Sequence, residues 1–329
     1  MKLSFLYILS ILKDTSFLRI VNYIAIWPGY WISVIIKKPV LFSQPFALSA
    51  EPVRGCNLSC SGCPAGNISG NEIKTIEADL FKRIINDIAS HTFYLQLWFQ
   101  GEPLLHTEID TIIQYARQKK MFVVIATNGL LLNASVCEML IKSGLSKIIV
   151  SINVSGKKSD FNVGGNYTNG KNNISLLSEL KKKHKTSFPI IEAQMTVTAE
   201  NEALTDMFKK EMKECGANNI SLKTTWFANL NDINLPVPVK YSRYSKNPDG
   251  TWRPKKAIRN KCFRIFSTIV VTYNGDVVPC CFDKEIKYSI GNISVHNLME
   301  IWKSERFNKY RGNVLNNRKI YDICRNCTE

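Results

Sequence analysis

The sequence predicts an α/β protein whose core is a parallel β-sheet. Short runs rich in β-branched and aromatic residues alternate with longer segments of helical spacing between residues 46 and 224. Each gap between two runs is long enough for a helical crossover, which parallel strands require. Hydrophobic residues make up 45% of the 329 residues, so the chain can bury a core and intrinsic disorder is excluded. Both an open sheet and a barrel fit this alternation.

Six strands and five connecting helices follow from this alternation. The strands are expected at residues 46–52, 94–98, 122–126, 147–152, 190–197 and 219–224. The helices between them are expected at residues 77–89, 107–119, 132–142, 172–183 and 203–215. The first helix illustrates the criterion, because Phe81, Ile84 and Ile88 recur at the spacing of one helix face. The loops after parallel strands are free to vary, so ligands are expected at the carboxyl ends of the strands.

The composition changes after about residue 231. Residues 236–261 hold eight Lys and Arg against one Asp, with aromatic residues interleaved. A solvated linker is the favoured interpretation, and a strip that holds an anionic or planar ligand is the alternative. Farther on, Asn274 and Gly275 suit the tight turn of a β-hairpin. A helix is expected next, around residues 298–307.

The N-terminal segment is apolar and is expected to be helical. Residues 20–36 carry no charge, but this run is shorter than the ~20 residues that span a bilayer. Pro28 and Gly29 are expected to break it. The favoured interpretation is a pair of helices packed on the following domain. Peripheral membrane contact is the alternative, because interfacial aromatic residues precede Lys37 and Lys38, which suit anionic headgroups.

Charge and cysteine content narrow the class of protein. The net charge of +16 indicates either an anionic partner or a well-solvated surface, and charge alone does not choose. Cys137 and Cys215 stand alone in helix-like segments, where a structural thiol is usual. Clustered thiols in a chain without a convincing secretory signal indicate metal ligation in a reducing cytoplasm. The clustered cysteines are Cys56, Cys60, Cys63, Cys262, Cys280, Cys281, Cys324 and Cys327.

The first cysteine group has the donor set of an iron–sulfur cluster. Cys56, Cys60 and Cys63 lie on one loop, and three thiolates this close can hold three corners of a cuboidal cluster. One iron then stays open to an exogenous ligand. A zinc site would need a fourth ligand, and no further Cys or His lies within 25 residues on either side. A coincidental trio, or a zinc site completed from afar, is the alternative.

These residues carry a family resemblance. Cys-x-x-x-Cys-x-x-Cys after a first strand resembles the signature of radical S-adenosylmethionine (SAM) enzymes. Gly101-Glu102-Pro103 is similar to their Gly-Glu-Pro motif, which receives the amino group of SAM, although Gln100 stands where Gly is commoner. The resemblance covers about residues 46–226. It implies a partial (β/α)6 TIM-like barrel that holds a [4Fe–4S] cluster and SAM.

Two further strand ends resemble the nucleoside pocket of this family. Thr127 and Asn128 follow the third strand, and Ser151 ends the fourth. Asn153 stands where the family usually has Asp. Gln194 is a plausible pocket residue on an inward-facing strand position.

The C-terminal cysteines resemble a second cluster site. Cys262, Cys280, Cys324 and Cys327 match the four-ligand arrangement of the SPASM group in its shortened Twitch form. An auxiliary [4Fe–4S] cluster is therefore expected in a small α+β domain, although four thiolates could also hold zinc. Cys281 is open to three interpretations: an alternative ligand, a catalytic hydrogen donor or a buried thiol.

The resemblance implies a radical mechanism. Reductive cleavage of SAM would give a 5′-deoxyadenosyl radical that takes a hydrogen atom from the substrate. The net reaction is expected to be a two-electron oxidation or a cross-link, made in a peptide or in a sugar or alcohol. Asp283 is a candidate proton acceptor, with a turn-closing role as the alternative. A reductant such as flavodoxin or ferredoxin is the expected partner, and nucleic acid is not.

The chain is expected to divide into three parts. These are an N-terminal helical segment (1–45), the radical SAM barrel (46–230), and a linker followed by the auxiliary-cluster domain (231–329). The protein is expected in the cytoplasm, with peripheral membrane contact through the first segment as an option. The competing function is a zinc-stabilised basic protein that binds nucleic acid or membrane without catalysis.

Overall fold

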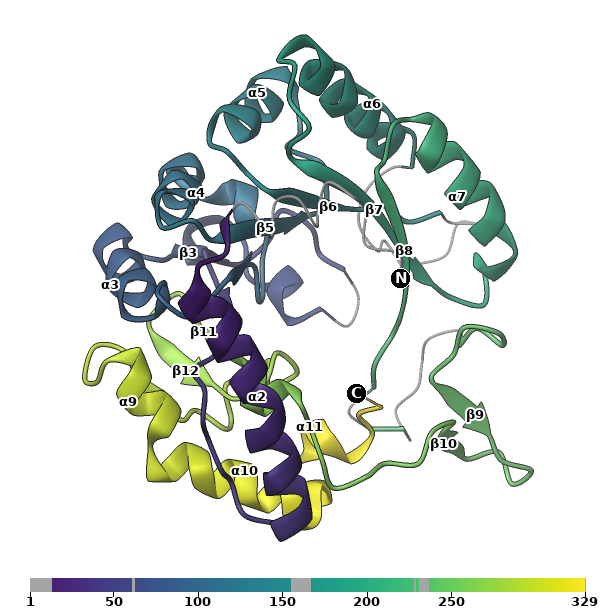
Figure 1. Cartoon of the computed structure of the whole chain (residues 1–329). Coiled ribbons are helices and arrows are strands. Elements are labelled where there is room, and N and C mark those ends of the chain that lie inside the picture. Colours follow the sequence, from purple (N-terminus) through teal and green to yellow (C-terminus); the bar gives the residue numbers. More distant parts are fainter. Residues whose placement is uncertain (1–13, 61–62, 155–166, 228, 231–236, 329) are drawn as a thin grey trace.

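The fold centres on a single large sheet (Figure 1). The computed structural model describes residues 14–60, 63–154, 167–227, 229–230 and 237–328. Six neighbouring strands run parallel and follow chain order, which confirms the predicted α/β fold with a large parallel sheet. These strands are β1 (Ala47–Ala50), β4 (Tyr94–Leu97), β5 (Phe122–Thr127), β6 (Lys147–Ser151), β7 (Ile190–Val197) and β8 (Asn219–Thr224).

Helices connect these strands and cover one face of the sheet (Figure 1). Alternate residues of β7, such as Ile191 and Met195, are fully buried in the main core, whereas Glu192 and Gln194 point to the other face. A smaller core around Phe93 and Phe122 fills that other face near the amino ends of the strands. The connecting helices are α3 (Ala78–Ile88), α4 (Ile109–Gln118), α5 (Ala134–Lys142), α6 (Tyr167–Lys183) and α7 (Thr205–Glu214).

The C-terminal region extends the same sheet beyond β1. Strand β11 (Thr268–Val271) pairs parallel with β1, and β12 (Asp276–Val278) pairs antiparallel with β11, so the predicted hairpin is confirmed. A short β13 (Gly291–Asn292) completes this edge. The sheet therefore crosses the proposed division at residue 230, which stays a prediction about folding units.

The helix expected around residues 298–307 is two helices in the structure. Helix α9 (Leu298–Lys303) ends before Ser304, and α10 (Glu305–Asn317) begins after it. The Ser304 hydroxyl accepts a hydrogen bond from the backbone N–H of Phe307, which caps the second helix. Short helices α8 (Arg264–Ser267) and α11 (Asp322–Arg325), which the sequence did not predict, complete this region.

Part of the expected linker is ordered. Strands β9 (Tyr244–Lys246) and β10 (Trp252–Pro254) form an antiparallel pair. The Tyr244 side chain is buried, and its hydroxyl accepts from the Phe227 N–H and donates to the Asn326 carbonyl. The interpretation as a solvated linker is therefore wrong for these residues, because one buried aromatic anchors the hairpin. The short pair β2 (Val53–Arg54) and β3 (Lys74–Thr75) was also not predicted.

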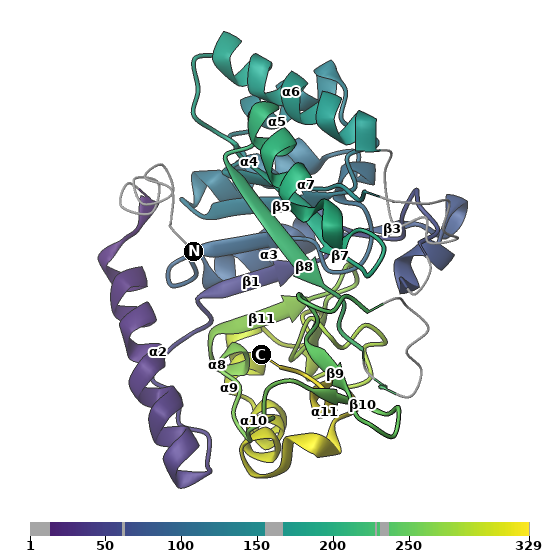
Figure 2. The same cartoon turned by 90° about the vertical axis from the view of Figure 1, so that its right-hand side faces the viewer.

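One helix, α2 (Phe17–Ile36), stands at the amino ends of the strands (Figure 2). It continues through Pro28, so the expected break is wrong. Proline removes one helical hydrogen bond, and the burial of Ile26 and Tyr30 on either side offsets that loss. Among the described residues, α2 is the helix that is long and apolar enough to cross a membrane by length and composition. The expected second helix falls partly on residues 1–13, outside the described residues.

Candidate functional site

The loop after β4 lies against the start of the cysteine loop. Gly101 has a φ of +105°, and a Cβ atom there would lie 2.4 Å from the Val53 carbonyl oxygen and 2.5 Å from that of Gly55. The backbone N–H of Glu102 donates to the Gly55 carbonyl at 3.0 Å. Only glycine fits this approach, because the backbone conformation and the space both exclude a side chain.

The Glu102 carboxylate joins the second and third loops of the rim. It is buried, and it accepts hydrogen bonds from the backbone N–H groups of Asn128 at 2.8 Å and Leu104 at 3.1 Å. Burial raises the pKa of Glu102, and these hydrogen bonds oppose the shift. The Asn128 amide donates to Asn57 Oδ1 at 2.8 Å and lies 3.7 Å from Cys56 Sγ. Three motifs that are far apart in sequence therefore meet at the carboxyl ends of β1, β4 and β5.

The first three cysteines share a loop held by its own backbone. The Cys56 N–H donates to the Ile68 carbonyl, and the Cys63 N–H donates to the Cys60 carbonyl at 3.1 Å. Cys56 and Cys60 are half-buried, while Cys63 is exposed. Residues 61–62 lie outside the described residues. The loop therefore presents its thiols toward solvent, where an incoming ligand can reach them.

The donor chemistry of this loop suits a cluster. Residues 56–63 supply three thiols and no His or carboxylate. Within the described ranges, no group of three or more His, Cys, Asp and Glu side chains is arranged to hold a single metal ion. Three thiolates can hold three corners of an iron–sulfur cluster, whereas structural zinc takes four ligands on one ion. These residues therefore fit an iron–sulfur group better than zinc.

The remaining rim residues lie farther along the sheet. Thr127 is buried, and its hydroxyl accepts from the Gly129 N–H at 3.0 Å. Ser151 and Gln194 are register partners on β6 and β7, so their side chains point to the same face. The Gln194 amide donates to Ser221 Oγ at 3.2 Å. These three predicted residues therefore continue the polar rim away from the cysteine loop.

Asn153, which the sequence analysis singled out, and Lys223 also belong to strand ends on this part of the sheet. Asn153 Oδ1 accepts from the Thr196 N–H at 3.2 Å, a contact that the Asp usual in the family could also make. Lys223 on β8 is exposed, yet burial of its surroundings lowers its pKa.

The four remaining predicted ligands come together in one pocket. Cys262, Cys280, Cys324 and Cys327 all line it, and burial raises the pKa of Cys324 to about 11. The Tyr310 hydroxyl lies 3.6 Å from Cys324 Sγ. Buried thiols resist ionisation unless a cation takes them as thiolates, which a cluster does. The pocket is otherwise lined by Arg264, Ile265, Phe282, Val314, Arg318 and Ile323.

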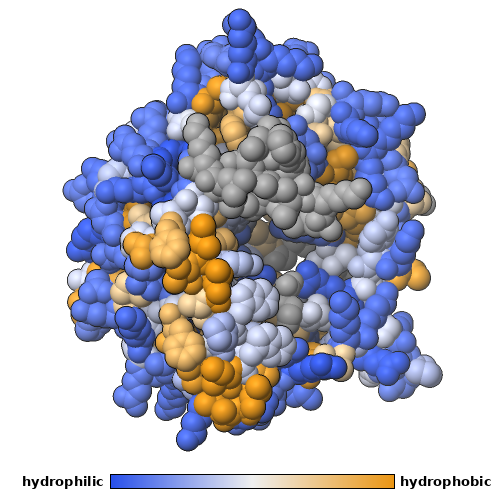
Figure 3. Space-filling model, viewed as in Figure 1, coloured by the Kyte–Doolittle hydropathy of each residue, from blue (hydrophilic) through white to orange (hydrophobic). Residues whose placement is uncertain are grey.

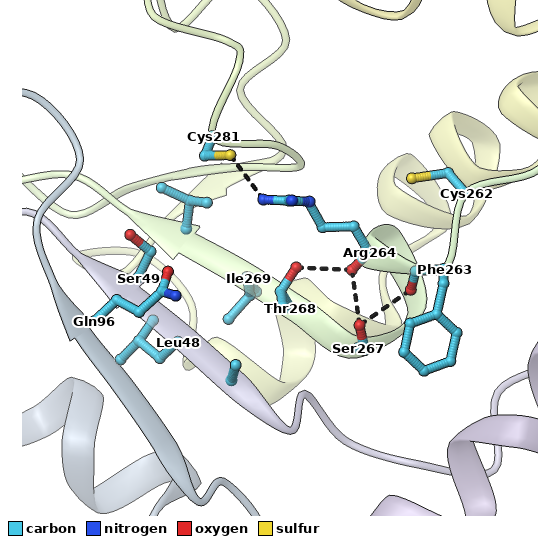
Figure 4. Close-up of a pocket in the computed structure, with 12 residues that line it drawn as sticks. Leu48, Ser49, Gln96, Cys262, Phe263, Arg264, Ser267, Thr268, Ile269 and Cys281 are labelled. Atoms are coloured by element: carbon cyan, nitrogen blue, oxygen red, sulfur yellow. Dashed lines mark hydrogen bonds between the residues drawn. The ribbon is translucent and has the colours of Figure 1, made fainter. Parts of the chain in front are cut away.

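A cavity of about 330 Å³ lies beside β1 and β11, with Cys262, Arg264 and Cys281 also on its walls (Figure 4). Ser49 and Gln96 line it from β1 and β4, and Cys281 lines it from the opposite side. The Arg264 guanidinium donates to Cys281 Sγ at 3.0 Å (Figure 4). Cys262 and Arg264 line both this cavity and the four-cysteine pocket, so the two spaces adjoin. The sequence analysis proposed Cys281 as a site residue, but it did not predict the hydrogen bond from Arg264.

Asp283 is buried in a turn. Its two carboxylate oxygens accept the backbone N–H groups of Lys287 and Tyr288, both at 2.9 Å. Burial raises the pKa of Asp283, and the two hydrogen bonds oppose that shift. These contacts are those of a turn-closing residue, and its role as a proton acceptor stays a prediction.

A pair of hydrogen bonds that the sequence did not predict links the rim to the C-terminal region. The Gln100 amide donates to the Lys284 carbonyl at 2.5 Å, and Lys284 Nζ donates to the Phe99 carbonyl at 2.7 Å. The buried Glu51 carboxylate also joins these segments, because it accepts hydrogen bonds from the backbone N–H groups of Gln100 and Tyr273. Burial raises the pKa of Glu51 to about 7. The one signal in the sequence was Gln100, where the motif commonly has glycine.

A parallel α/β sheet with a three-cysteine loop at its carboxyl rim, beside a four-cysteine pocket, defines a radical SAM protein with an auxiliary iron–sulfur region. Comparison with protein families agrees with this class. Residues 50–191 match the radical SAM superfamily, and residues 262–328 match SPASM, an iron–sulfur cluster-binding domain. The chain therefore carries a radical SAM domain and a SPASM domain.

Individual relatives are distant but cover most of the chain. The tungsten-containing aldehyde ferredoxin oxidoreductase cofactor-modifying protein of Pyrococcus furiosus is 23% identical over 85% of this chain and 86% of its own length. The S-adenosyl-L-methionine-dependent 2-deoxy-scyllo-inosamine dehydrogenase of Niallia circulans is 22% identical over 87% and 93%. Streptococcus suis SuiB, solved with its precursor peptide SuiA, has a TM-score of 0.62 at 15% identity and shares the fold over 91% of this chain and 73% of its own.

The two matched domains establish the cofactors. The radical SAM domain binds a [4Fe–4S] cluster and SAM, and the SPASM domain binds auxiliary iron–sulfur. The alternative of a zinc-stabilised binding protein without catalysis finds no support, because both matched domains are iron–sulfur domains.

Proposed function

We propose that this chain is a radical SAM enzyme that oxidises or cross-links a peptide or a sugar-derived substrate held in the 330 Å³ cavity. The observation that supports this proposal most directly is the position of the cavity. It adjoins both the sheet and the four-cysteine pocket, and Cys281 lines it. When bound, the cluster and SAM supply a carbon radical that removes a hydrogen atom from a substrate C–H bond. The protein's part is to align that bond and exclude water.

Cys56, Cys60 and Cys63 hold the first cluster in this proposal. The buried Glu102 carboxylate and the Asn128 amide fix the loops around it, which supports a rim preorganised for SAM. The six strands in unbroken chain order support a partial (β/α)6 barrel, with SAM lying across the carboxyl ends of its strands. The nucleoside would extend toward the other rim residues, which are Gly101, Pro103, Thr127, Ser151 and Gln194.

Cys262, Cys280, Cys324 and Cys327 hold a second [4Fe–4S] cluster in the adjoining pocket. The four thiols converge in a pocket that apolar side chains, Tyr310, Arg264 and Arg318 surround, which supports a closed site with no open corner. Cys281 lines the substrate cavity, where Arg264 donates a hydrogen bond to its thiol, and this thiol also shares a hydrogen bond with the thiol of Cys280. We therefore assign Cys281 to the substrate, as a hydrogen donor or an additional contact.

The cavity has the size of a single substrate unit. A volume of about 330 Å³ is near the lower end for small-molecule sites, enough for one side chain or one sugar ring. Relatives whose names or titles include a peptide and an inosamine support both classes. Polar groups from Ser49 and Gln96 can bind either, through hydroxyl or amide groups of the substrate. The reductant is proposed to be a small electron-transfer protein such as flavodoxin or ferredoxin.

Anaerobic reconstitution tests the proposal. Two four-iron clusters predict about eight iron atoms per chain, and dithionite with SAM should yield 5′-deoxyadenosine. Cys56→Ala should abolish SAM cleavage, whereas Cys324→Ala should keep cleavage and lose substrate turnover. Cys215→Ala is the matched control, because Cys215 lies outside both groups and should change neither. Zinc without iron, or unchanged cleavage after Cys56→Ala, would overturn the proposal.

A further inference from the structure

Helix α2 presents an apolar face to solvent (Figure 3). Eleven of the seventeen large hydrophobic side chains that are exposed in the described part of the chain lie on this helix. Phe17 is 78% exposed, Ile24 is 61% and Ile35 is 75%. An apolar surface gathered on one element, rather than scattered singly, marks an interaction site. The others are Leu18, Ile20, Val21, Tyr23, Trp27, Trp31, Ile32 and Ile36.

The opposite face of α2 is partly polar and is fixed to the protein body. The buried Arg19 guanidinium donates to the backbone carbonyls of Ala89, Lys119 and Lys120. The Asn22 amide donates to the Gln44 and His91 carbonyls, both at 3.2 Å. A surface helix of a soluble protein normally turns its polar side outward, and α2 does the reverse. These contacts also oppose a spanning orientation, because spanning would pull a buried arginine away from its carbonyl partners.

The charges around this face suit an anionic surface. Helix α2 contains no Asp or Glu. Exposed Lys37 and Lys38 follow its carboxyl end, and exposed Lys119 and Lys120 lie beside its amino end. Nζ of Lys261 lies 5.4 Å from the centroid of the Trp31 ring, which is itself exposed. Tryptophan and lysine at the edges of an apolar strip are typical of helices that lie in a lipid headgroup layer.

We propose that α2 lies in the plane of an anionic lipid bilayer, with its apolar face in the boundary between headgroups and acyl chains. Its partners are the loops that precede β1, β4 and β5, so α2 occupies the amino-terminal edge of the sheet (Figure 2). The cysteine loop lies at the opposite, carboxyl edge. Binding in this orientation leaves the cysteine loop on the side away from the bilayer. The proposed substrate cavity lies nearer to α2, because Phe263 lines this cavity and stacks on Trp27. The proposal is independent of the reaction proposed above.

Flotation of the full chain with lipid vesicles tests this proposal. Vesicles of phosphatidylglycerol and phosphatidylcholine should carry the protein, and pure phosphatidylcholine vesicles should carry much less. The double substitution Ile24→Asp/Ile35→Asp should reduce the bound fraction at least about tenfold, because it places two charges in the apolar strip. The matched control is Val239→Asp/Val295→Asp, at positions that are 82% and 74% exposed but lie away from α2. The control should float like the unchanged chain.

A second pair of variants separates the charge contribution. Lys37→Glu/Lys38→Glu should weaken flotation about tenfold at low salt and less at high salt. Circular dichroism and iron content should stay unchanged in every variant, because all four substituted sites on or next to α2 are exposed. Equal flotation of the two Asp double variants would overturn the proposal. So would a dimer that Ile24→Asp/Ile35→Asp splits into monomers without any vesicle binding, since a second copy would then cover this face.

Discussion

The two cysteine groups differ in how the chain encloses them. In the cysteine loop, Cys63 is exposed and Cys60 is half-buried. The close approach of Gly101 and the hydrogen bond from the Asn128 amide hold the start of this loop. In the C-terminal pocket, Cys280 and Cys324 are buried, and both apolar side chains and two arginines surround them. A centre that must admit a reactant needs an open position, whereas a centre that only holds its metal gains from closure. The burial of the thiols therefore distinguishes a site that admits a reactant from a closed metal site better than the number of cysteines does.

The largest effect on SAM cleavage is expected from a substitution of Gly101, because this glycine lets the β4 loop lie against the cysteine loop. Gly101→Ala would bring Cβ to 2.4 Å from the Val53 carbonyl, so the β4 loop must move away from the cysteine loop. SAM cleavage should fall at least about a hundredfold, measured as 5′-deoxyadenosine formed. Gly70→Ala is the control, because Gly70 also has a positive φ but no atom lies within 4 Å of the added Cβ. Its effect should be limited to about 1 kcal/mol of backbone strain. Equal losses in both variants would contradict the close-approach argument.

Alkylation compares the two groups directly. In metal-free protein kept anaerobic, iodoacetamide should label Cys63 at least about a hundredfold faster than Cys324 at neutral pH. Cys63 is exposed, while Cys324 is buried with a pKa of about 11, so little thiolate forms there. Mass spectrometry of time points gives both rates in one sample. Similar rates would mean that the pocket opens when its metal is absent.

The hydrogen bonds between the two regions should make a modest contribution to the free energy of unfolding. Gln100→Gly removes the amide that reaches Lys284, and Lys284→Met removes the ammonium that reaches Phe99. Each should lower the free energy of unfolding by about 1–2 kcal/mol. The double variant should lose less than the sum of the two, because both bonds join the same pair of loops. Thermal unfolding of the reconstituted chain measures all three. Strict additivity would show that the two bonds act separately.

The last effect is a change of stability that is spread over several pH units, and it comes from Glu51. Burial raises its pKa from 4.5 to about 7, so the folded state holds its proton at pH values where the unfolded state has lost it. This group's contribution to stability is greatest below about pH 4.5 and declines as the pH rises to about 7. The stability of Glu51→Gln relative to the unchanged chain should therefore rise across that interval, by up to about 3 kcal/mol. A difference that stays constant with pH would refute the assignment.

Local pattern was enough to predict the strands of the parallel sheet. The expected strand at residues 190–197 coincides with β7, and the one at 219–224 coincides with β8. In β7 the signal is a set of buried apolar and β-branched residues, whereas in the half-buried β8 it is the alternation of polar and apolar residues. The loops that meet at the rim could be predicted for the same reason, because parallel strands end at a common edge.

Features that depend on distant partners could not be read from the sequence. Helix α2 continues through Pro28 because its inner face is anchored to loops that follow much later in the chain. The β9–β10 pair depends on Tyr244, whose burial involves residues near the C-terminus. The contact between Arg264 and Cys281 joins a short helix to the segment after a hairpin, and nothing local to either residue indicates it.

Strand β1 has a consequence for electron flow. It is hydrogen-bonded to β4 on one side and to β11 on the other, in a continuous parallel register from Ala47 to Ala50. The two cysteine-containing regions are therefore joined through β1 in one continuous sheet, and they are not separate bodies connected by a hinge. The shared ladder therefore limits how far the distance for electron transfer between the two regions can change, because a hinge motion would have to break the hydrogen bonds of β1.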